Sequence, residues 1–145
     1  MPAKNESVNL NVQPGQNNGN GWQSVQALNS QQWYSFKYTG GNNDNGGLKT
    51  KTNDGVATIA VTLDGNNNRY SISGVNFTGD IQPPQLSSTY TTQSASITDQ
   101  NTQNLTADYC VNVVDSNTGL TVPCDPMIQN DPKNPMPMMH RIQHN

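Results

Sequence analysis

Two cysteines give this chain its most definite chemical geometry. Cys110 and Cys124 end a segment that reads as a strand, a tight turn and a second strand. If residues 115–119 form a five-residue loop, the cysteines lie directly opposite each other, with Cα atoms about 5.5 Å apart, which is within disulfide range. A four-residue loop would shift the pairing by one residue and turn the two side chains to opposite faces. The spacing therefore leaves two interpretations open, a disulfide and a pair of buried thiols.

Soft metal ligands gather near the end of the sequence. Met138, His140 and His144 lie there, and Cys124 lies upstream of them. Thioether, imidazole and thiolate groups form the ligand set expected for copper(I). The alternating pattern of the same segment also fits a last strand whose methionines fill the core. Copper handling is therefore kept as an alternative, and no metal or cofactor is assigned.

The remaining chemical candidates are turn carboxylates and tryptophans. Gly-, Asn- or Pro-rich turns hold Asp44, Asp54, Asp64, Asp115, Asp125 and Asp131. Turn formation explains these residues, and calcium binding is the alternative. Trp22 follows a Gly/Asn-rich loop and could stack against a sugar, although core packing would also explain an aromatic residue. Both histidines lie close to the C-terminus, which argues against Ser-His-Asp or Cys-His catalysis. We therefore expect no enzyme.

The composition limits the kinds of partner. The 145 residues include 22 Asn, 13 Gln, 14 Thr and 11 Ser, whereas only 12% are charged. A net charge of -3 without a basic run argues against a nucleic-acid partner. The sequence has no apolar run of about 18 residues and no apolar stretch after its first lysine, so we expect no membrane partner and no secretory signal. A start at Met1 without such a signal favours a cytoplasmic location.

Strands must position these candidates, and period-two alternation predicts several of them. The clearest lie at residues 8–12, 32–38, 56–63, 105–114 and 120–124. The strand at 56–63 should be central to a sheet and should form a hairpin with residues 69–73, extended past a bulge at Gly74. Pro123 lacks an N–H and therefore indicates an edge strand.

Residues 88–97 are rich in Thr and Ser but weakly apolar, and they read as an edge strand. Because no lysine protects that edge, we expect that it could pair with a second copy of the chain and form a homo-oligomer. No segment shows a convincing helical period. Seven or eight short strands between turn-rich loops indicate an antiparallel β-sandwich.

A short Asp-Pro segment carries a family resemblance. After Tyr109-Cys110, the residues Cys124-Asp125-Pro126 and Asp131-Pro132 resemble the DP-EP family of bacterial proteins. The chain contains no Glu-Pro pair. The resemblance implies an immunoglobulin-like β-sandwich of seven strands with Greek-key topology, and it implies no catalytic residue.

We therefore predict an all-β, antiparallel, immunoglobulin-like Greek-key sandwich of seven or eight strands. One domain should span residues 1–145, with a Pro/Met-rich C-terminal segment at 125–145. The predicted function is a non-enzymatic binding or assembly module whose partner is a protein or a glycan. The alternatives are a carbohydrate- or calcium-binding surface module and a copper-handling protein.

Overall fold

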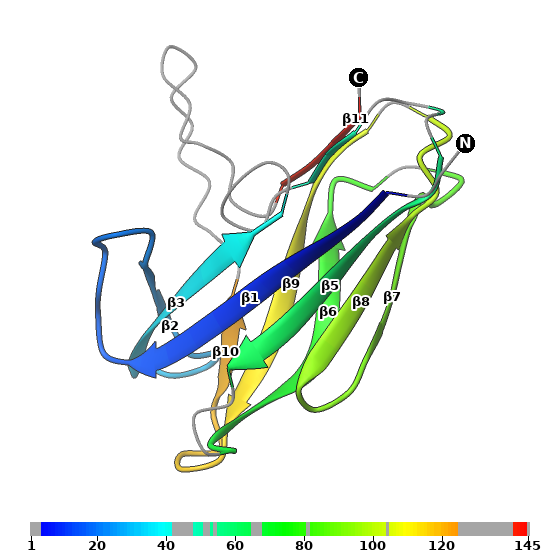
Figure 1. Cartoon of the computed structure of the whole chain (residues 1–145). Coiled ribbons are helices and arrows are strands. Elements are labelled where there is room, and N and C mark those ends of the chain that lie inside the picture. Colours follow the sequence, from blue (N-terminus) through cyan, green and yellow to red (C-terminus); the bar gives the residue numbers. More distant parts are fainter. Residues whose placement is uncertain are drawn as a thin grey trace.

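The computed structural model describes residues 4–41, 48–50, 53, 55–64, 68–80, 82–103, 105–124 and 141–144. Within these ranges the chain forms eleven strands and no helix, so nothing there could cross a membrane as a long apolar helix (Figure 1). The strands are β1 (Lys4–Pro14), β2 (Gln23–Gln26), β3 (Trp33–Gly40), β4 (Leu48–Thr50), β5 (Ala57–Asp64), β6 (Tyr70–Thr78), β7 (Leu86–Tyr90), β8 (Ser94–Asp99), β9 (Thr106–Asp115), β10 (Thr121–Cys124) and β11 (Arg141–His144). The all-β class predicted from the sequence is confirmed.

Six strands form the first sheet, called sheet A, in the order β2-β3-β1-β5-β8-β7. Four of its five neighbouring pairs are antiparallel, but β1 and β5 are parallel, with Val8 opposite Val61 and Leu10 opposite Leu63. The central place predicted for residues 56–63 is confirmed, because β5 lies between β1 and β8. The N-terminal strand therefore lies inside the sheet and not at its edge.

The second sheet, sheet B, is organised around β9. This strand pairs with β6 along one side and with β10 and β11 along the other, and β11 pairs in parallel with β4. In Figure 1, β1, β5 and β8 of sheet A lie in front of β6, β9 and β10 of sheet B. In both sheets, neighbouring strands are therefore often far apart in the sequence.

One hydrophobic core lies between the inner faces of the two sheets. Alternation along β5 buries Ile59 and Val61 and leaves the side chains between them outside. Sheet B contributes Val111 and Val113 from β9 to the same cluster, and both are fully buried. This period of two is the ordinary result of pleating, which sends successive side chains to opposite faces of a strand.

Two backbone hydrogen bonds connect the sheets at their edges. The Leu28 N–H donates to the Thr121 carbonyl at 2.9 Å, which ties the segment after β2 to β10. The Ile72 N–H donates to the Thr92 carbonyl at 2.8 Å, which ties β6 to the turn after β7. Each bond satisfies a backbone group that the sheets would otherwise leave unpaired.

The predicted hairpin of β5 with β6 is wrong. β5 pairs with β1 and β8 in sheet A, whereas β6 pairs with β9 in sheet B. An alternating pattern shows which side chains are buried but not which strand pairs with which, so neighbouring strands can belong to different sheets. The bulge expected at Gly74 is confirmed, because the register with β9 shifts between Ile72 and Gly74.

The single strand predicted for residues 88–97 is two strands, β7 and β8. The Thr91 hydroxyl accepts hydrogen bonds from the N–H groups of Gln93 and Ser94, and these bonds stabilise the turn between the two strands. β7 lies at the edge of sheet A, as predicted. With this division and the short strands β2, β4 and β11, the described residues form eleven strands where the sequence predicted seven or eight.

The β9–β10 hairpin has a four-residue loop, so the five-residue loop expected at 115–119 is wrong. The Asp115 N–H donates to the Leu120 carbonyl at 2.9 Å and thus keeps Asp115 in the ladder. Its carbonyl accepts the Gly119 N–H at 2.7 Å, and Gly119 has a φ of 72°, which glycine adopts without strain. In this register Cys124 lies opposite Val111. The edge position inferred from Pro123 is confirmed, because β10 is the last strand of its sheet.

Candidate functional site

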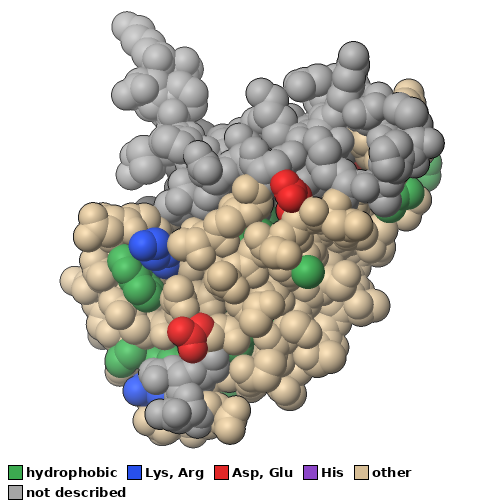
Figure 2. Space-filling model, viewed as in Figure 1, with side chains coloured by type: hydrophobic (Ala, Val, Ile, Leu, Met, Phe, Trp, Pro, Cys, Tyr) green, Lys and Arg blue, Asp and Glu red, His purple; other side chains and the backbone are tan. Residues whose placement is uncertain are grey.

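The outer face of sheet A is covered by short hydroxyl side chains. Thr62 lies opposite Ser94, and Ser96 lies between Ala60 and Thr89. We call this surface the Ser/Thr face; its members are Thr58, Thr62, Ser87, Thr89, Thr91, Ser94, Ser96 and Thr98. Most of the described surface seen in Figure 2 carries neither hydrophobic nor charged side chains. Such a face offers hydrogen-bond donors and acceptors with almost no electrostatic field.

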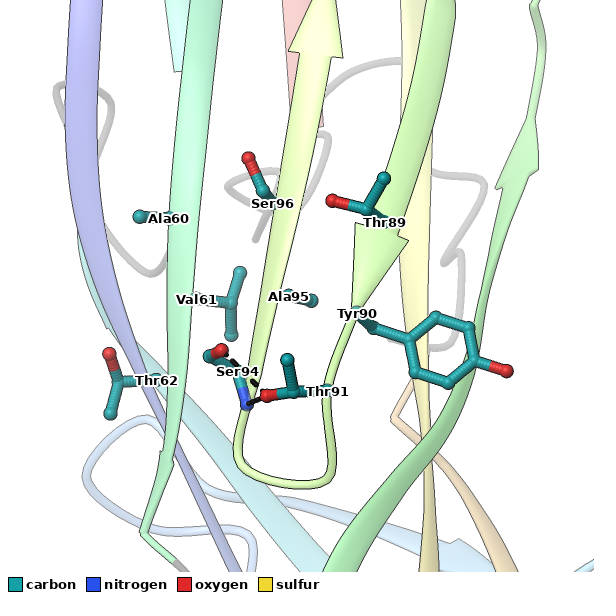
Figure 3. A pocket seen from close by; sticks show the side chains of 9 residues that line it. All are labelled: Ala60, Val61, Thr62, Thr89, Tyr90, Thr91, Ser94, Ala95 and Ser96. Atoms are coloured by element: carbon teal, nitrogen blue, oxygen red, sulfur yellow. Dashed lines mark hydrogen bonds between the residues drawn. The ribbon is translucent and has the colours of Figure 1, made fainter.

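A hollow of about 240 Å³ lies within this face near the turn between β7 and β8. Figure 3 shows Thr91 and Ser94 at the end of the hollow next to this turn, where their hydroxyls are hydrogen-bonded at 2.9 Å. Ala60, which is exposed on β5, leaves the space open because its side chain is small. Tyr90 is at the side of the hollow, 51% exposed, and its ring points away from β8. The hollow is shallow and contains no charged group among its lining residues.

A second hollow, of about 330 Å³, has a more specific lining. It is lined by Trp22, the amides of Asn11 and Gln13, the carboxylate-bearing Asp64, and Val12. We call it the Trp22 hollow. Asn11 and Gln13 alternate with core residues of β1, and Asn11 lies opposite Asp64 of β5. The parallel pairing of these two strands therefore brings the amide and the carboxylate together.

A tightly bonded loop positions Trp22. Its N–H donates to the Gly19 carbonyl at 3.0 Å, closing a turn in which Asn20 has a φ of 55°. The loop is attached to β2 by two further bonds: the Asn17 N–H donates to the Ser24 hydroxyl at 2.9 Å, and the Ser24 N–H donates to the Asn18 side-chain oxygen at 3.1 Å. The Gly/Asn-rich composition thus produces a defined loop, which holds Trp22 half-buried.

A buried hydroxyl lies next to this loop. Ser35 alternates with the core residues Tyr34 and Phe36, which places its side chain on the outer face of β3, yet it is fully buried. It lies opposite Gln13 of β1 and Ser24 of β2. Its hydroxyl has no hydrogen-bond partner in the described part of the chain. Buried hydroxyls are rarely left unsatisfied, so this polar position beside Gln13 and the Trp22 loop is unusual.

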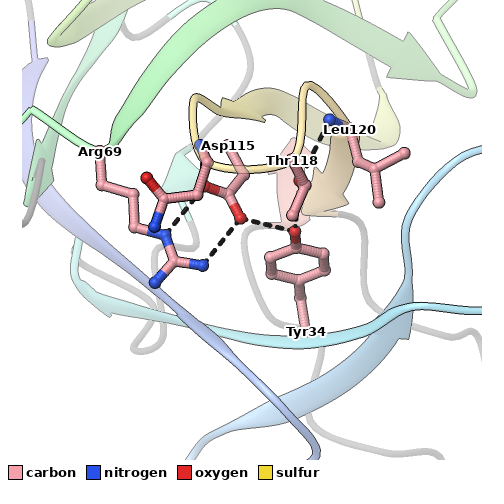
Figure 4. A network of polar contacts seen from close by, with 6 residues as sticks. Tyr34, Arg69, Asp115, Thr118 and Leu120 are labelled. Atoms are coloured by element: carbon pink, nitrogen blue, oxygen red, sulfur yellow. Dashed lines mark hydrogen bonds and ion pairs between the residues drawn. The ribbon is translucent and has the colours of Figure 1, made fainter.

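A polar network at the hairpin turn fixes Asp115 (Figure 4). Its carboxylate is fully buried and accepts the Tyr34 hydroxyl at 2.6 Å, and it accepts the Nε and Nη2 groups of Arg69 at 2.8 and 2.9 Å. The Asn117 N–H adds a bond at 3.0 Å. The bonds from Arg69 hold the pKa of Asp115 well below its usual range, and those from Tyr34 and Asn117 act in the same direction. Burial, followed by the bond to Asp115, raises the pKa of Tyr34.

The network connects the two sheets, because Tyr34 belongs to β3 and Asp115 to β9. The Tyr34 hydroxyl also contacts the Thr118 hydroxyl at 2.9 Å. Every side-chain oxygen of Asp115 is engaged by fixed donors, so the residue is arranged for stability and not for proton transfer. Asp115 therefore has a structural role that extends beyond turn formation.

The two cysteines lie on opposite faces of sheet B. Cys124 is fully buried in the core, whereas Cys110 is 8% exposed, and its thiol donates to the Asn112 side-chain oxygen at 3.6 Å. Both are thiols in the structure. The disulfide interpretation is wrong for this conformation, because the four-residue loop moves Cys124 opposite Val111.

Tyr38 supports this hairpin from sheet A. Its hydroxyl donates to the Cys124 carbonyl at 2.8 Å and accepts the Val111 N–H at 3.3 Å. The phenol thus bridges two backbone groups of β9 and β10 that lie opposite each other. Complete burial raises the pKa of Tyr38 well above its usual value, so the hydroxyl keeps its proton.

The structure describes only some of the other predicted ligands. Met138 and His140 lie outside the described residues, as do the turn carboxylates at positions 44, 54, 125 and 131. The backbone of His144 belongs to β11. Across the described ranges, no three His, Cys, Asp or Glu side chains lie close enough together to hold a metal ion.

Sequence reasoning singled out Trp22 and Asp64 but missed Asn11 and Gln13. Alternation with Val8, Leu10 and Val12 marks both amides as outward-facing. However, nothing in the local sequence shows that β5 pairs in parallel with β1 and brings Asp64 beside Asn11.

No protein-family model matches this chain, and no curated protein matches it.

Proposed function

We propose that this protein is a non-enzymatic binding module that takes a neutral glycan in the Trp22 hollow. The observation that carries the proposal is the lining: an indole ring, two amides and one carboxylate around a single hollow of about 330 Å³. An indole offers a flat apolar surface to the C–H groups of a sugar ring, and amide and carboxylate groups exchange hydrogen bonds with its hydroxyls. The volume lies within the usual range for small-molecule sites.

The carboxylate count favours binding over hydrolysis. Glycoside hydrolysis generally uses two carboxyl groups on either side of the scissile bond. Asp64 is the one carboxylate among the described residues that line the hollow. It can accept hydrogen bonds from sugar hydroxyls, but it has no partner there to act as the second catalytic group.

The surface beside the hollow favours a glycan of several units. Asp64 and Thr62 are two positions apart on β5, so the Trp22 hollow continues onto the Ser/Thr face. The uncharged hydroxyls of that face can hydrogen-bond further sugar units. The negative charge of Asp64 and the net charge of -3 disfavour acidic sugars.

For the fold, we propose an immunoglobulin-like Greek-key sandwich of the kind found in the DP-EP family. The shared core of two sheets and the predominance of antiparallel pairs support this assignment. The Asp-Pro segment after Cys124 supports the family resemblance. A fold of this type has many uses, so the proposed function depends on the hollow and not on the fold.

Tryptophan fluorescence can test glycan binding, because the chain has only Trp22 and Trp33. In the Trp33→Phe variant, the remaining indole reports on the hollow. Titration with a panel of neutral monosaccharides and oligosaccharides should give a saturable change in emission. Asp64→Asn should weaken the affinity about tenfold, because hydrogen bonds to a charged group contribute about 1.5–3 kcal/mol.

Calorimetry with the same sugars provides the matched comparison. Trp22→Ala should abolish binding, whereas Trp33→Ala, at an exposed tryptophan on β3, should bind like the wild type. Circular dichroism would confirm that each variant is folded. If no sugar of the panel binds up to its solubility limit, or if Trp22→Ala binds as tightly as the wild type, the proposal is wrong.

A further inference from the structure

We infer that the Trp22 hollow selects sugars that carry an acetamido group, which Lys37 and Asp64 bind from opposite sides. This inference rests on the glycan binding proposed above and names the class of glycan. It comes from a row of three side chains on the outer face of sheet A, with a hydrogen-bond donor at one end and an acceptor at the other.

The row crosses three neighbouring strands, β3, β1 and β5 (Figure 1). Asn11 of β1 lies opposite Lys37 of β3 on one side and opposite Asp64 of β5 on the other. All three alternate with buried core residues, so their side chains share the outer face of the sheet. Neighbouring strands lie about 4.8 Å apart, which puts the two outer positions about 9.5 Å from each other. An ammonium and a carboxylate therefore flank the amide of Asn11.

Gly21 places the end of the Lys37 side chain beside the Trp22 loop. A Cβ on Gly21 would lie 3.3 Å from Cε of Lys37 and 3.8 Å from its Cδ, so the lysine runs along the glycine. Gly21 directly precedes Trp22, which lines the hollow together with Asp64. The Lys37 ammonium therefore lies on the side of the Trp22 loop, and the Asp64 carboxylate lies on the side of β5.

Both charges are available to a ligand. Lys37 is half-buried and Asp64 is exposed. Neither forms an ion pair with another described residue, whereas Arg69 and Asp115 are paired with each other. A bound group can therefore contact the ammonium and the carboxylate without breaking an ion pair in the described part of the chain.

The two charges together favour a neutral, dipolar group. A carboxylate on the ligand would meet Lys37 but would be repelled by Asp64, and an ammonium would meet Asp64 but would be repelled by Lys37. A secondary amide has no net charge, and it has an acceptor oxygen on one side and a donor N–H on the other. Its carbonyl can accept from the Lys37 ammonium while its N–H donates to the Asp64 carboxylate. Hydrogen bonds of this kind, with charged groups, are the stronger ones.

The spacing favours an acetamido group over a hydroxyl. The C=O and N–H of a trans amide point in opposite directions, so their two partners lie about 8 Å apart. The two partners of a single hydroxyl lie at most about 5.5 Å apart. Of the two groups, the amide therefore extends across most of the distance between Lys37 and Asp64, with Asn11 beneath it. The methyl group of the acetamide is apolar and can pack against the indole of Trp22.

Three sugars that differ at one position test the inference by calorimetry. N-acetylglucosamine, glucose and glucosamine share one ring and carry an acetamido, a hydroxyl and an ammonium group at that position. N-acetylglucosamine should bind about tenfold more tightly than glucose, because the acetamide adds a hydrogen bond to a charged group. Glucosamine should bind no more tightly than glucose, because Lys37 repels its charge.

Two variants of β3 test the role of Lys37. Lys37→Met keeps the apolar part of the side chain along Gly21 but removes the ammonium. It should reduce the affinity for N-acetylglucosamine to that for glucose and leave the affinity for glucose nearly unchanged. Thr39→Val is the matched control, because it removes a polar group from the same face of β3, one row away, and should keep the preference. Circular dichroism would confirm that both variants are folded.

The outcomes separate this inference from the proposed function. Glucose and N-acetylglucosamine that bind equally well, with binding lost in Trp22→Ala, would overturn the acetamido preference and leave glycan binding intact. Tighter binding of glucosamine than of N-acetylglucosamine, or a preference that survives Lys37→Met, would also overturn it. If none of the three sugars nor any other sugar of the panel binds, both proposals are wrong.

Discussion

Replacing Asp115 by asparagine is the most direct test of the network that connects the two sheets. The substitution keeps the size of the side chain but removes its charge and one of its two acceptor oxygens. In the wild type these oxygens serve Tyr34, Arg69 and Asn117 at 2.6–3.0 Å. An amide can accept from only some of these donors, and its NH₂ group must face one of the others.

The structure sets the size of the expected loss. A lost hydrogen bond to the buried Tyr34 hydroxyl costs about 1 kcal/mol, and a donor facing a donor costs about another 1 kcal/mol. The ion pair adds little to this sum, because 25% of the Arg69 side chain is exposed and solvent screens its charge. Asp115→Asn should therefore lower the free energy of unfolding by about 2 kcal/mol. For a chain of this length, that corresponds to a decrease in melting temperature of about 6–8 °C.

The loss should depend on pH in one direction. The pKa of Asp115 is lowered in the folded state, so its stabilising contribution is complete above its unfolded pKa of about 3.9 and is lost as the pH falls toward the folded pKa. Urea unfolding followed by circular dichroism measures the free energy of unfolding of each protein at pH 7 and at pH 3. The difference between wild type and Asp115→Asn should be smaller at pH 3 than at pH 7.

The exposed Asp64 provides a matched control. Asp64→Asn should change the free energy of unfolding by less than about 0.5 kcal/mol, as is usual for surface substitutions. The reasoning is refuted if Asp115→Asn is no more destabilising than this control at pH 7. A difference that increases as the pH falls would also contradict it.

Two further predictions concern a glycine and the thiols. Gly40→Ala should destabilise the fold by about 2–4 kcal/mol in urea unfolding, because Gly40 has a φ of 99° and a Cβ there would lie 2.5 Å from the Ser7 carbonyl oxygen. A Cβ on Gly119 would have no atom within 4 Å, so Gly119→Ala should cost only about 1 kcal/mol. Equal losses for the two variants would show that the close approach to β1 is unimportant. In native-state alkylation followed by mass spectrometry, Cys110 should react before Cys124, because Cys110 lies on the outer face and Cys124 in the core. Equal labelling rates, or a mass that rises only after reduction, would contradict the placement of the thiols.

The strands were more predictable from the sequence than their pairing. Alternation in β3, β5 and β9 follows directly from pleating, because one face of each strand must be apolar. The failed hairpin of β5 with β6 shows the limit of this signal. Whether a strand pairs with its neighbour in sequence or with a distant one depends on core packing, which no local pattern encodes. The turn at Thr91 was missed for a related reason, since threonine favours strands as well as turns of this kind.

The candidate site was predictable only in part. Trp22 could be found because a Gly/Asn-rich loop precedes it, and such loops commonly carry binding residues. Asn11 and Gln13 could be identified only as outward-facing, because their approach to Asp64 depends on the parallel pairing of β1 with β5. The sequence allowed a four-residue or a five-residue loop between the cysteines. The backbone hydrogen bonds of Asp115 with Leu120 and Gly119 fix the four-residue loop, and the sequence does not reveal them.

The bridge that Tyr38 makes between β9 and β10 has a consequence for how the chain reaches its native state. The Tyr38 hydroxyl stabilises one register of the hairpin, because it can form both of its hydrogen bonds only when the Cys124 carbonyl lies opposite the Val111 N–H. The register that would bring Cys110 opposite Cys124 is displaced by one residue and offers Tyr38 no such pair. Oxidation and correct pairing therefore exclude each other. A disulfide formed early in folding would trap the chain in the wrong register, and Tyr38 favours the register that keeps the two sulfurs on opposite faces of the sheet.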